Sequence, residues 1–195
     1  MALDLEPDAW LKRLIHQHED EMSDLRLMDS YYEGTQALSY LAPEIQAELS
    51  DRMRQLIINW PQLVVDALDE RLDIEGFRYG DSETTERDLW AIWQANELDE
   101  GSQQVHVDAL ALKRSYVIVG ANEDDDATPL VTAESALEVF AELDPRTRKV
   151  MAAIKRWDEP AASGSTPTHM ATLDLPKGRY TFEKEKGAWK QPDED

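Results

Sequence analysis

Tyr116-Val117-Ile118-Val119-Gly120 is the stretch at which the apolar pattern of this chain changes period. Its aromatic and β-branched residues favour strands, and a run this short that ends in glycine does not suit a helix. We expect a strand here that is buried on both faces. Helical spacing precedes the stretch and strand-like runs follow it. The sequence therefore predicts an α+β fold in which amino-terminal helices lead into a mostly antiparallel sheet.

The residues before this strand carry apolar side chains at spacings of three and four, which is typical of amphipathic helices. About five helices fit this pattern within residues 8–113, because prolines and capping residues interrupt it. We place them at about 8–31, from Pro43 to Ile57, from Pro61 to Leu72, from Ser82 or Thr84 to Asn96, and at about 100–113.

The residues after this strand form shorter runs that are separated by turn-forming residues. Asp144-Pro145-Arg146-Thr147 has the composition of a tight turn, with proline fixing φ at its second position. Further strands are expected at 130–131, 137–142, 148–157, 168–175 and 179–185. We therefore divide the chain into a core at 1–157 (helical over 8–113, strands over 114–157), an exposed loop at 158–167, a β-hairpin extension at 168–190 and a disordered acidic tail at 191–195.

The charge balance is strongly acidic, with 41 Asp and Glu against 20 Lys and Arg and a net charge of −21 over 195 residues. Such a chain is not a generic basic nucleic-acid binder. It contains no cysteine, which excludes disulfides, thiolate zinc sites, iron–sulfur clusters and cysteine nucleophiles. Its first residues lack the features of a secretory signal, and no apolar stretch approaches the length of about 18 residues that a membrane span needs. We expect a soluble protein made inside the cell.

Two clusters contain metal-ligating residue types, and neither has the spacing of a metal site. His16 and His18 lie two residues apart in the first expected helix, whereas helical ligand pairs are three or four residues apart. His18 falls on the apolar stripe, and we expect it in the core or at an interface. The run Asp124-Asp125-Asp126 lacks the glycine and terminal glutamate of a calcium loop, so we interpret it as a solvated hairpin tip. We expect no metal and no cofactor.

Motifs that identify common enzyme classes are absent from the sequence. It has no G-x-x-x-x-G-K-[ST] phosphate loop, no G-x-G-x-x-G, no G-x-S-x-G elbow and no H-E-x-x-H. The sequence therefore offers no motif that assigns a catalytic activity. A hydrolase that uses carboxylates with His106 or His169 is a further possibility, and it has no motif behind it.

Tryptophan is abundant for a chain of this length, with six residues. Indole side chains are favoured both in cores and at the centres of protein interfaces. Trp90 and Trp93, three residues apart on a helix, suit a core position from which one ring reaches an interface. The interface candidates are Trp10, Trp60, Trp90, Trp93, Trp157 and Trp189.

The first half of the chain contains a series of sequence landmarks. Tyr31–Gly34 (YYEG) follows the first expected helix, and Leu38–Leu41 (LSYL) comes shortly after it. Asn59 precedes the segment Val64–Phe77 (VVDALDERLDIEGF). The later landmarks are Trp93–Asp99 (WQANELD), Ala109-Leu110, Arg114–Val117 (RSYV), Pro129, Glu134-Ser135 and Asp144-Pro145.

In this order, the landmarks resemble the amino-terminal wing region of double-stranded-DNA bacteriophage portal proteins, of the group that siphophages of actinobacteria carry. The resemblance covers about residues 10–157. That group commonly has a glycine before its Arg-Ser-Tyr segment, and here the position is Lys113. Whole portal subunits are more than twice as long and continue into stem, clip and crown. The chain would thus be a wing fragment, a split gene product or part of a longer protein.

The resemblance implies a structural role in the virion and a protein that is not an enzyme. Portal proteins form a ring, usually of twelve subunits, at one capsid vertex. Through this ring the terminase pumps DNA, and connector and tail proteins dock on it. The implied partners are neighbouring subunits, the major capsid protein, terminase, head–tail connector proteins and double-stranded DNA that passes without sequence-specific binding. Synthesis in the bacterial host cytoplasm is implied as well.

An acidic surface does not hold phosphates, so the charge of the chain would suit a conduit along which DNA slides. A function of another class is the alternative: a standalone acidic adaptor or inhibitor domain that binds a basic protein partner.

Overall fold

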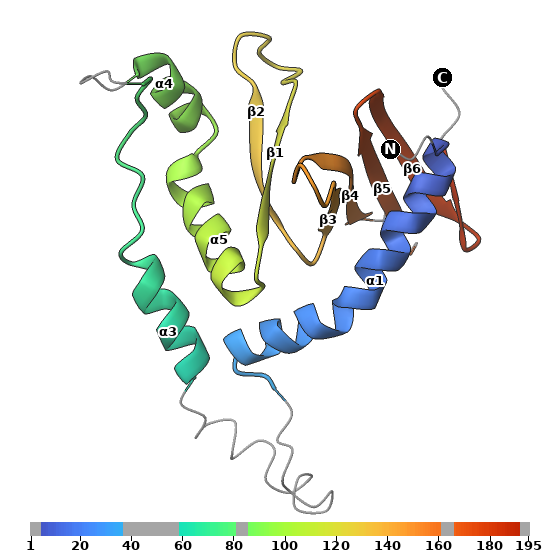
Figure 1. The fold of residues 1–195 in the computed structure, drawn as a ribbon, viewed down its shortest axis with the longest axis horizontal. Coiled ribbons are helices and arrows are strands. Elements are labelled where there is room, and N and C mark those ends of the chain that lie inside the picture. The colour runs from blue at the N-terminus through green and yellow to red at the C-terminus, as the bar shows by residue number, and fades with distance from the viewer. Residues whose placement is uncertain (1–4, 37–58, 81–85, 161–165, 192–195) are drawn as a thin grey trace, which may run out of the picture. The chain divides into compact units, whose positions relative to one another are not determined.

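The computed structural model describes residues 5–36, 59–80, 86–160 and 166–191. Contacts divide the chain into two compact units. Unit 1 comprises Met1–Ser23 with Leu137–Asp195, and unit 2 comprises Asp24–Ala136. Helix α1 (Pro7–Tyr32) contributes residues to both units (Figure 1). Residues near the start of the chain therefore pack with residues from its last third.

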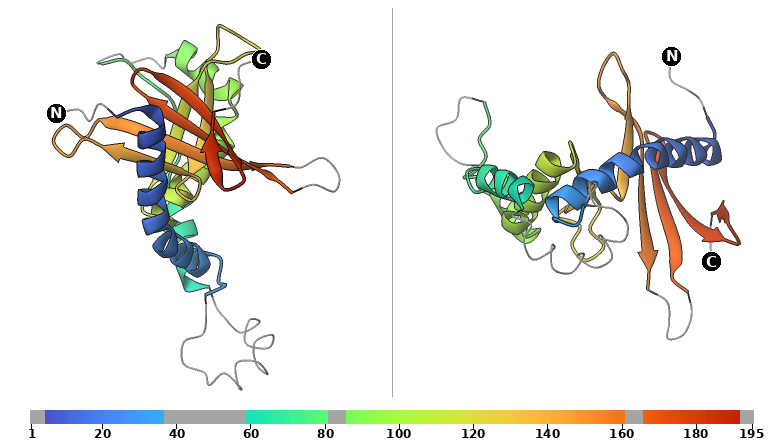
Figure 2. Two further views of the ribbon diagram at one scale, coloured as in Figure 1. Left: turned by 90° about the vertical axis from the view of Figure 1, so that its right-hand side faces the viewer. Right: turned by 90° about the horizontal axis from the view of Figure 1, so that it is seen from below.

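Unit 1 is built on a five-stranded antiparallel sheet in which each strand pairs with its neighbour in sequence (Figure 2). The order is β3 (Val139–Leu143), β4 (Val150–Glu159), β5 (Thr168–Leu175), β6 (Gly178–Glu185) and β7 (Ala188–Lys190). Because β5 lies between β4 and β6, the strands after the predicted 158–167 loop complete the sheet. Strand β4 also continues two residues into that segment, since Asp158 and Glu159 pair with β5.

The first turns of α1 supply one side of the core of unit 1. Apolar residues of this helix recur at three- and four-residue spacing, which places them on a single face. These turns of α1 lie against the sheet (Figure 2), and their apolar residues share its buried cluster, which confirms this part of the predicted apolar stripe. The buried cluster consists of Trp10, Leu11, Leu14, Phe140, Ala152, Ile154, Ala171, Leu173 and Phe182.

The predicted tight turn between β3 and β4 is also confirmed. The carboxylate oxygen Oδ1 of Asp144 accepts hydrogen bonds from the backbone N–H groups of Arg146, at 2.8 Å, and Thr147, at 2.7 Å. These bonds lower the pKa of Asp144 below its ordinary value. An aspartate at the first position of the turn therefore stabilises the hairpin, as its turn propensity predicts.

Unit 2 contains the other helices and a β-hairpin. They are α3 (Trp60–Asp69), α4 (Arg87–Ala95), α5 (Leu98–Ala111), β1 (Ser115–Gly120) and β2 (Leu130–Ser135). Helix α5 packs on both strands (Figure 1). The predicted α+β class is confirmed, with four helices in the part of the chain that the structure describes. The predicted helix that opens at Pro43 falls outside the described residues.

The expectation that the strand at 116–119 is buried on both faces is wrong. Val117 is 52% exposed and Val119 is 64% exposed. Among the described residues β1 pairs only with β2, and the face of this hairpin that carries Val117 and Val119 is incompletely covered. An apolar run alone does not reveal what covers each face of a strand.

The predicted helix boundaries are mostly confirmed, with two differences. Helix α3 begins after Asn59, with Pro61 in its first turn as predicted, but it ends at Asp69, before Leu72. Helix α4 begins after Glu86, which makes no side-chain capping bond. The proposed caps Ser82 and Thr84 lie outside the described residues.

Candidate protein-binding surface

The tryptophans of unit 1 are at least partly covered by their own unit. Trp10 is 4% exposed in the core, so it is not available to a partner while unit 1 is folded. Trp189 packs against the edge of the same cluster, and the ammonium of Lys184 lies 5.7 Å from its ring centroid. Trp157 lies on β4 and is half-buried. Of the three, only Trp157 and Trp189 remain interface candidates.

The tryptophans of unit 2 occupy two different environments. Trp60, at the start of α3, is 62% exposed. Trp90 and Trp93 on α4 are half-buried, with stacked rings whose centroids are 6.2 Å apart. Phe77 contacts both, at centroid distances of 6.2 and 5.4 Å. The two rings of α4 thus pack with Phe77, as predicted for a core position, but they are not fully enclosed.

Helix α3 presents an exposed apolar face. Trp60, Leu63, Val64 and Leu68 lie at helical spacing and are 47–62% exposed, and the helix has no buried residue. An amphipathic helix ordinarily turns such a stripe toward a core. This stripe, which we call the α3 face, is left uncovered by the described residues. Contiguous apolar surface of this kind is typical of a protein interface.

Hydrogen bonds hold the other side of α3 against the end of α1. Asn59 caps α3 by accepting from the backbone N–H of Gln62 at 3.3 Å, and its amide donates to the carbonyl of Tyr32 at 2.5 Å. The hydroxyl of Tyr32 donates to Asp66 at 3.1 Å. The pKa of Tyr32 is raised, mainly because the side chain is partly buried and secondly because of this hydrogen bond. Residues from three of the sequence landmarks therefore meet at one contact.

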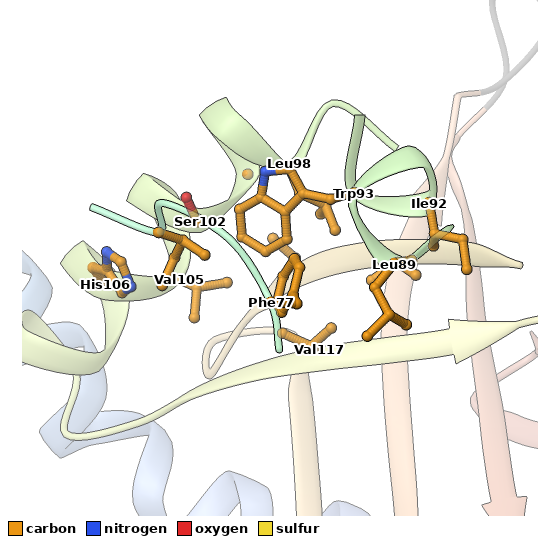
Figure 3. A pocket seen from close by; sticks show the side chains of 13 residues that line it. Phe77, Leu89, Ile92, Trp93, Leu98, Ser102, Val105, His106 and Val117 are labelled. Atoms are coloured by element: carbon orange, nitrogen blue, oxygen red, sulfur yellow. The ribbon is translucent and has the colours of Figure 1, made fainter. Parts of the chain in front are cut away.

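A cavity of about 410 Å³ lies between α4, α5, the β1–β2 hairpin and the segment before α4 (Figure 3). Its walls are almost wholly apolar. In the close view Phe77 lies between Trp93 and Val117, with Leu89 beside them. We call this the α4–α5 pocket. Sequence reasoning missed it, because its walls come from four separate segments.

The corner between α4 and α5 fixes the wall of this pocket. The indole N–H of Trp93 donates to Asp99 Oδ1 at 2.7 Å, and Gln94 donates to the other oxygen at 2.9 Å. These two bonds lower the pKa of Asp99. Asn96 caps α4 and donates to the carbonyl of Pro129 at 3.0 Å. Hydrogen bonds from the landmark Trp93–Asp99 thus connect α4 to α5 and to the start of β2.

The histidines considered for catalysis lie in different units. In unit 2, His106 Nδ1 is 3.6 Å from Asp69 Oδ1, and His106 forms one end of the α4–α5 pocket (Figure 3). The nearby Ser102 hydroxyl donates to the carbonyl of Asp99 at 3.2 Å. In unit 1, His169 Nδ1 lies 2.5 Å from an exposed carboxylate, Asp158. The structure therefore joins each histidine to one carboxylate and does not join the two histidines.

The residues considered for metal binding are dispersed. His16 is exposed and lies 3.7 Å from Asp20. His18 is fully buried, stacks on Phe140 and lies with Nδ1 3.0 Å from the guanidinium of Arg156, which confirms the predicted core position. No group of three potential metal ligands is present among the described residues.

The run at 124–126 lies in the connection between β1 and β2, as predicted for a hairpin tip. Its three aspartates are exposed. Asp125 accepts from the backbone N–H of Ala127 at 3.0 Å and from Thr128, and the bond to Thr128 is the main cause of its lowered pKa. These hydrogen bonds are typical of an aspartate that stabilises a turn, which explains Asp125 without a metal ion.

Comparison with known proteins gives a consistent result. The family model described as phage portal protein, SPP1 Gp6-like, matches residues 11–195. The portal protein of Mycobacterium phage D29 is 29% identical over 183 residues, which cover 90% of this chain and 36% of the relative. The portal protein of Mycobacterium phage L5 is 30% identical over 158 residues, which cover 77% of this chain and 32% of the relative. The chain thus spans about a third of the length of these curated relatives.

Proposed function

The chain belongs to the phage portal protein family, and from this premise we propose that it supplies the outer, wing-like part of a subunit in a portal ring at a capsid vertex. In this role it is a structural component of the conduit for DNA packaging and ejection. The ring has about twelve subunits, the usual number for the family it resembles. The complete subunit is made in the bacterial host cytoplasm and meets the major capsid protein, terminase and head–tail connector proteins.

The observation that carries this proposal is the α3 face. Ring subunits meet through two different surfaces, because each subunit contacts one neighbour with one side and the next neighbour with the other. Trp60 and Val64 belong to an apolar stripe that a monomer would gain nothing by exposing. A neighbouring subunit that covers this face would stabilise the assembly by about 25 cal/mol for each Å² of apolar surface that becomes buried.

The charge of the chain supports the proposed conduit. At a net charge of −21, its surface repels phosphates, so DNA passes without being held by counterion release. Subunits of this charge also repel one another, and screening by salt weakens that repulsion. Among the described residues, no helix combines the length and apolarity needed to cross a bilayer. The family match favours this structural role over a standalone adaptor.

The mass of the purified chain in solution tests the proposal. We expect light scattering on a sizing column to detect multi-subunit species that increase with salt, and negative-stain images to show rings. Val64→Lys places a charge in the α3 face and should shift the chain to monomer. Val150→Lys is the matched control, because Val150 is equally exposed, at 58% against 59%, and lies in unit 1.

Two results would contradict the proposal. A monomer at every salt concentration would show that this region does not carry subunit contacts. Equal effects of the two lysine substitutions would show that the α3 face has no special part in assembly and that added charge alone changes the mass.

A further inference from the structure

The α4–α5 pocket is a second apolar feature of unit 2 and is separate from the α3 face. Its volume of about 410 Å³ lies in the range of roughly 300–1,000 Å³ that is typical of ligand-binding pockets. The lining includes Phe77, Leu89, Trp93 and Val117, with His106 at one end (Figure 3). Such a lining suits one large apolar or aromatic side chain.

Hydrogen bonds fix the pocket walls before any partner arrives. Asp99 accepts from the Trp93 indole at 2.7 Å, and Asn96 accepts from the backbone N–H of Val131 at 2.8 Å. The carbonyl of Phe77 accepts from the backbone N–H of Glu86 at 2.7 Å, which ties the segment before α4 to the start of that helix. A preformed pocket loses little conformational entropy on binding.

The surroundings of the pocket are acidic. Segments 69–78 and 86–106, which supply most of the lining, carry nine carboxylates and three arginines. Five of the carboxylates are exposed and are immediate sequence neighbours of lining residues, and we call these five the acidic rim: Asp73 and Glu75 next to Ile74, Asp88 next to Leu89, and Glu97 and Asp99 next to Leu98. An apolar centre surrounded by charged residues is the arrangement of a protein interface hot spot, and a positively charged partner would complement these carboxylates.

We propose that the α4–α5 pocket binds a basic segment of another protein, which inserts one large apolar side chain while its Lys and Arg residues meet the acidic rim. A second copy of this chain fits less well, because the net charge of −21 makes its own surface repulsive to this rim. The inference rests on the pocket and its rim, so it holds whether or not the α3 face assembles a ring.

Val117 and Val119 provide a matched pair for the test. Both are exposed residues of β1, at 52% and 64%, and their cross-strand partners Ala133 and Val131 place them on the same face of the hairpin. Only Val117 lines the pocket. Lysine at either position adds the same charge to an exposed site, and only Val117→Lys also obstructs the binding of an apolar anchor.

The probe is a panel of acetylated, amidated heptapeptides in which three lysines lie on each side of a central Leu, Phe or Trp. Binding to the full chain is followed by the NMR signal of the Trp93 indole N–H, assigned with Trp93→Phe. We expect at least one peptide to shift this signal with saturation. An Ala-centred peptide should bind at least tenfold more weakly, and a version with glutamates in place of lysines should cause no shift.

The variants then separate pocket binding from attraction by charge alone. We expect Val117→Lys to weaken the best peptide at least tenfold and Val119→Lys to weaken it less than about threefold. Three results would overturn the proposal. The two variants could lose the same amount of affinity, the affinity could be the same for every central residue of the peptide, or no peptide could shift the signal. The Trp93 signal could also shift when the chain is concentrated without peptide. If Val117→Lys abolishes that shift, the pocket binds a second copy of this chain and the proposal is overturned.

Discussion

The side-chain oxygen of Asn96 accepts a hydrogen bond from the backbone N–H of Val131 at 2.8 Å, across 35 residues of sequence. The same amide group donates to the carbonyls of Ile92, at 2.9 Å, and Pro129, at 3.0 Å. One side chain thus closes the end of α4 and holds β2 beside it. This residue therefore adds a hydrogen-bonded link between α4 and the hairpin to the packing of α5 on both strands.

Asn96→Ala should lower the free energy of unfolding of unit 2 by about 2 kcal/mol, because it leaves the half-buried N–H of Val131 and carbonyl of Pro129 without this partner. Urea unfolding followed by tryptophan fluorescence gives the magnitude, and hydrogen exchange of 115–135 gives the location. Asn122→Ala is the control. Asn122 accepts from the backbone N–H of Asp124 within the β1–β2 connection, so its loss should cost less than about 1 kcal/mol. Equal costs would show that Asn96 is not a specific link.

Gly34→Ala should destabilise unit 2 by about 1–2 kcal/mol. Gly34 follows the last turn of α1 with φ of 68°, which glycine adopts without the penalty paid by other residues. An added Cβ would also lie 3.1 Å from Nδ2 of Asn59, the residue that caps α3. Gly80→Ala separates the two causes, because Gly80 has φ of 50° with nothing within 4 Å of its added Cβ. A larger loss at Gly34 than at Gly80, measured by urea unfolding, is the expected result, and equal losses would contradict the contact with Asn59.

Glu142→Gln should reveal a pH-dependent link between α1 and the sheet of unit 1. Arg13 donates to both carboxylate oxygens of Glu142, at 2.7 and 2.9 Å, and the bond lowers the pKa of Glu142 below its ordinary value of 4.5. A carboxyl whose pKa is lower in the folded state stabilises the fold above its unfolded pKa and loses this contribution as pH falls through the folded pKa. Since Arg13 is 41% exposed, we expect only about 1 kcal/mol at pH 7.

Urea unfolding of the wild type and of Glu142→Gln at a series of pH values measures this contribution. The difference in stability should be constant above about pH 5 and should shrink as pH falls from 4.5, the ordinary pKa, towards the lower pKa of the folded carboxyl. A difference that persists unchanged to pH 3 would show that packing of the side chain, and not its charge, links Arg13 to Glu142.

The sequence predicted those elements whose cause is local. Apolar periodicity predicted α1, turn composition predicted the β3–β4 hairpin at Asp144, and the break at Pro61 predicted the start of α3. Each of these depends on residues within a few positions of one another. Landmarks such as Trp93–Asp99 could be recognised by resemblance, but their role at the α4–α5 corner became visible only in the structure.

The sequence could not predict features that depend on distant residues. Strand β1 was expected to be enclosed, and the exposure of Val119 shows that the described residues leave its face of the hairpin partly uncovered. The short strand β7 has no distinct pattern and exists because it pairs with β6. The grouping of α1 with strands more than a hundred residues later likewise rests on a shared core, to which α1 contributes Trp10 and β6 contributes Phe182.

Lys113→Gly should stabilise unit 2, which is an unusual expectation for a glycine substitution. Lys113 directly follows the capping residue of α5, Leu112, and has φ of 69°. This left-handed conformation costs a residue with a Cβ about 1–2 kcal/mol, whereas glycine adopts it freely at an entropic cost of roughly 0.5–1 kcal/mol. The portal group that the sequence resembles commonly has glycine at this position. Here the residue is lysine, but the backbone keeps the conformation that glycine favours.

The expected gain for Lys113→Gly is about 0.5–1 kcal/mol in the free energy of unfolding. Lys113→Ala is the matched control, because it removes the exposed lysine side chain and retains the Cβ, so its stability should stay within about 0.5 kcal/mol of the wild type. Urea unfolding of the three chains under one condition decides the matter. If alanine stabilises as much as glycine, the gain comes from removing the lysine charge or chain, and the backbone at the end of α5 is not strained.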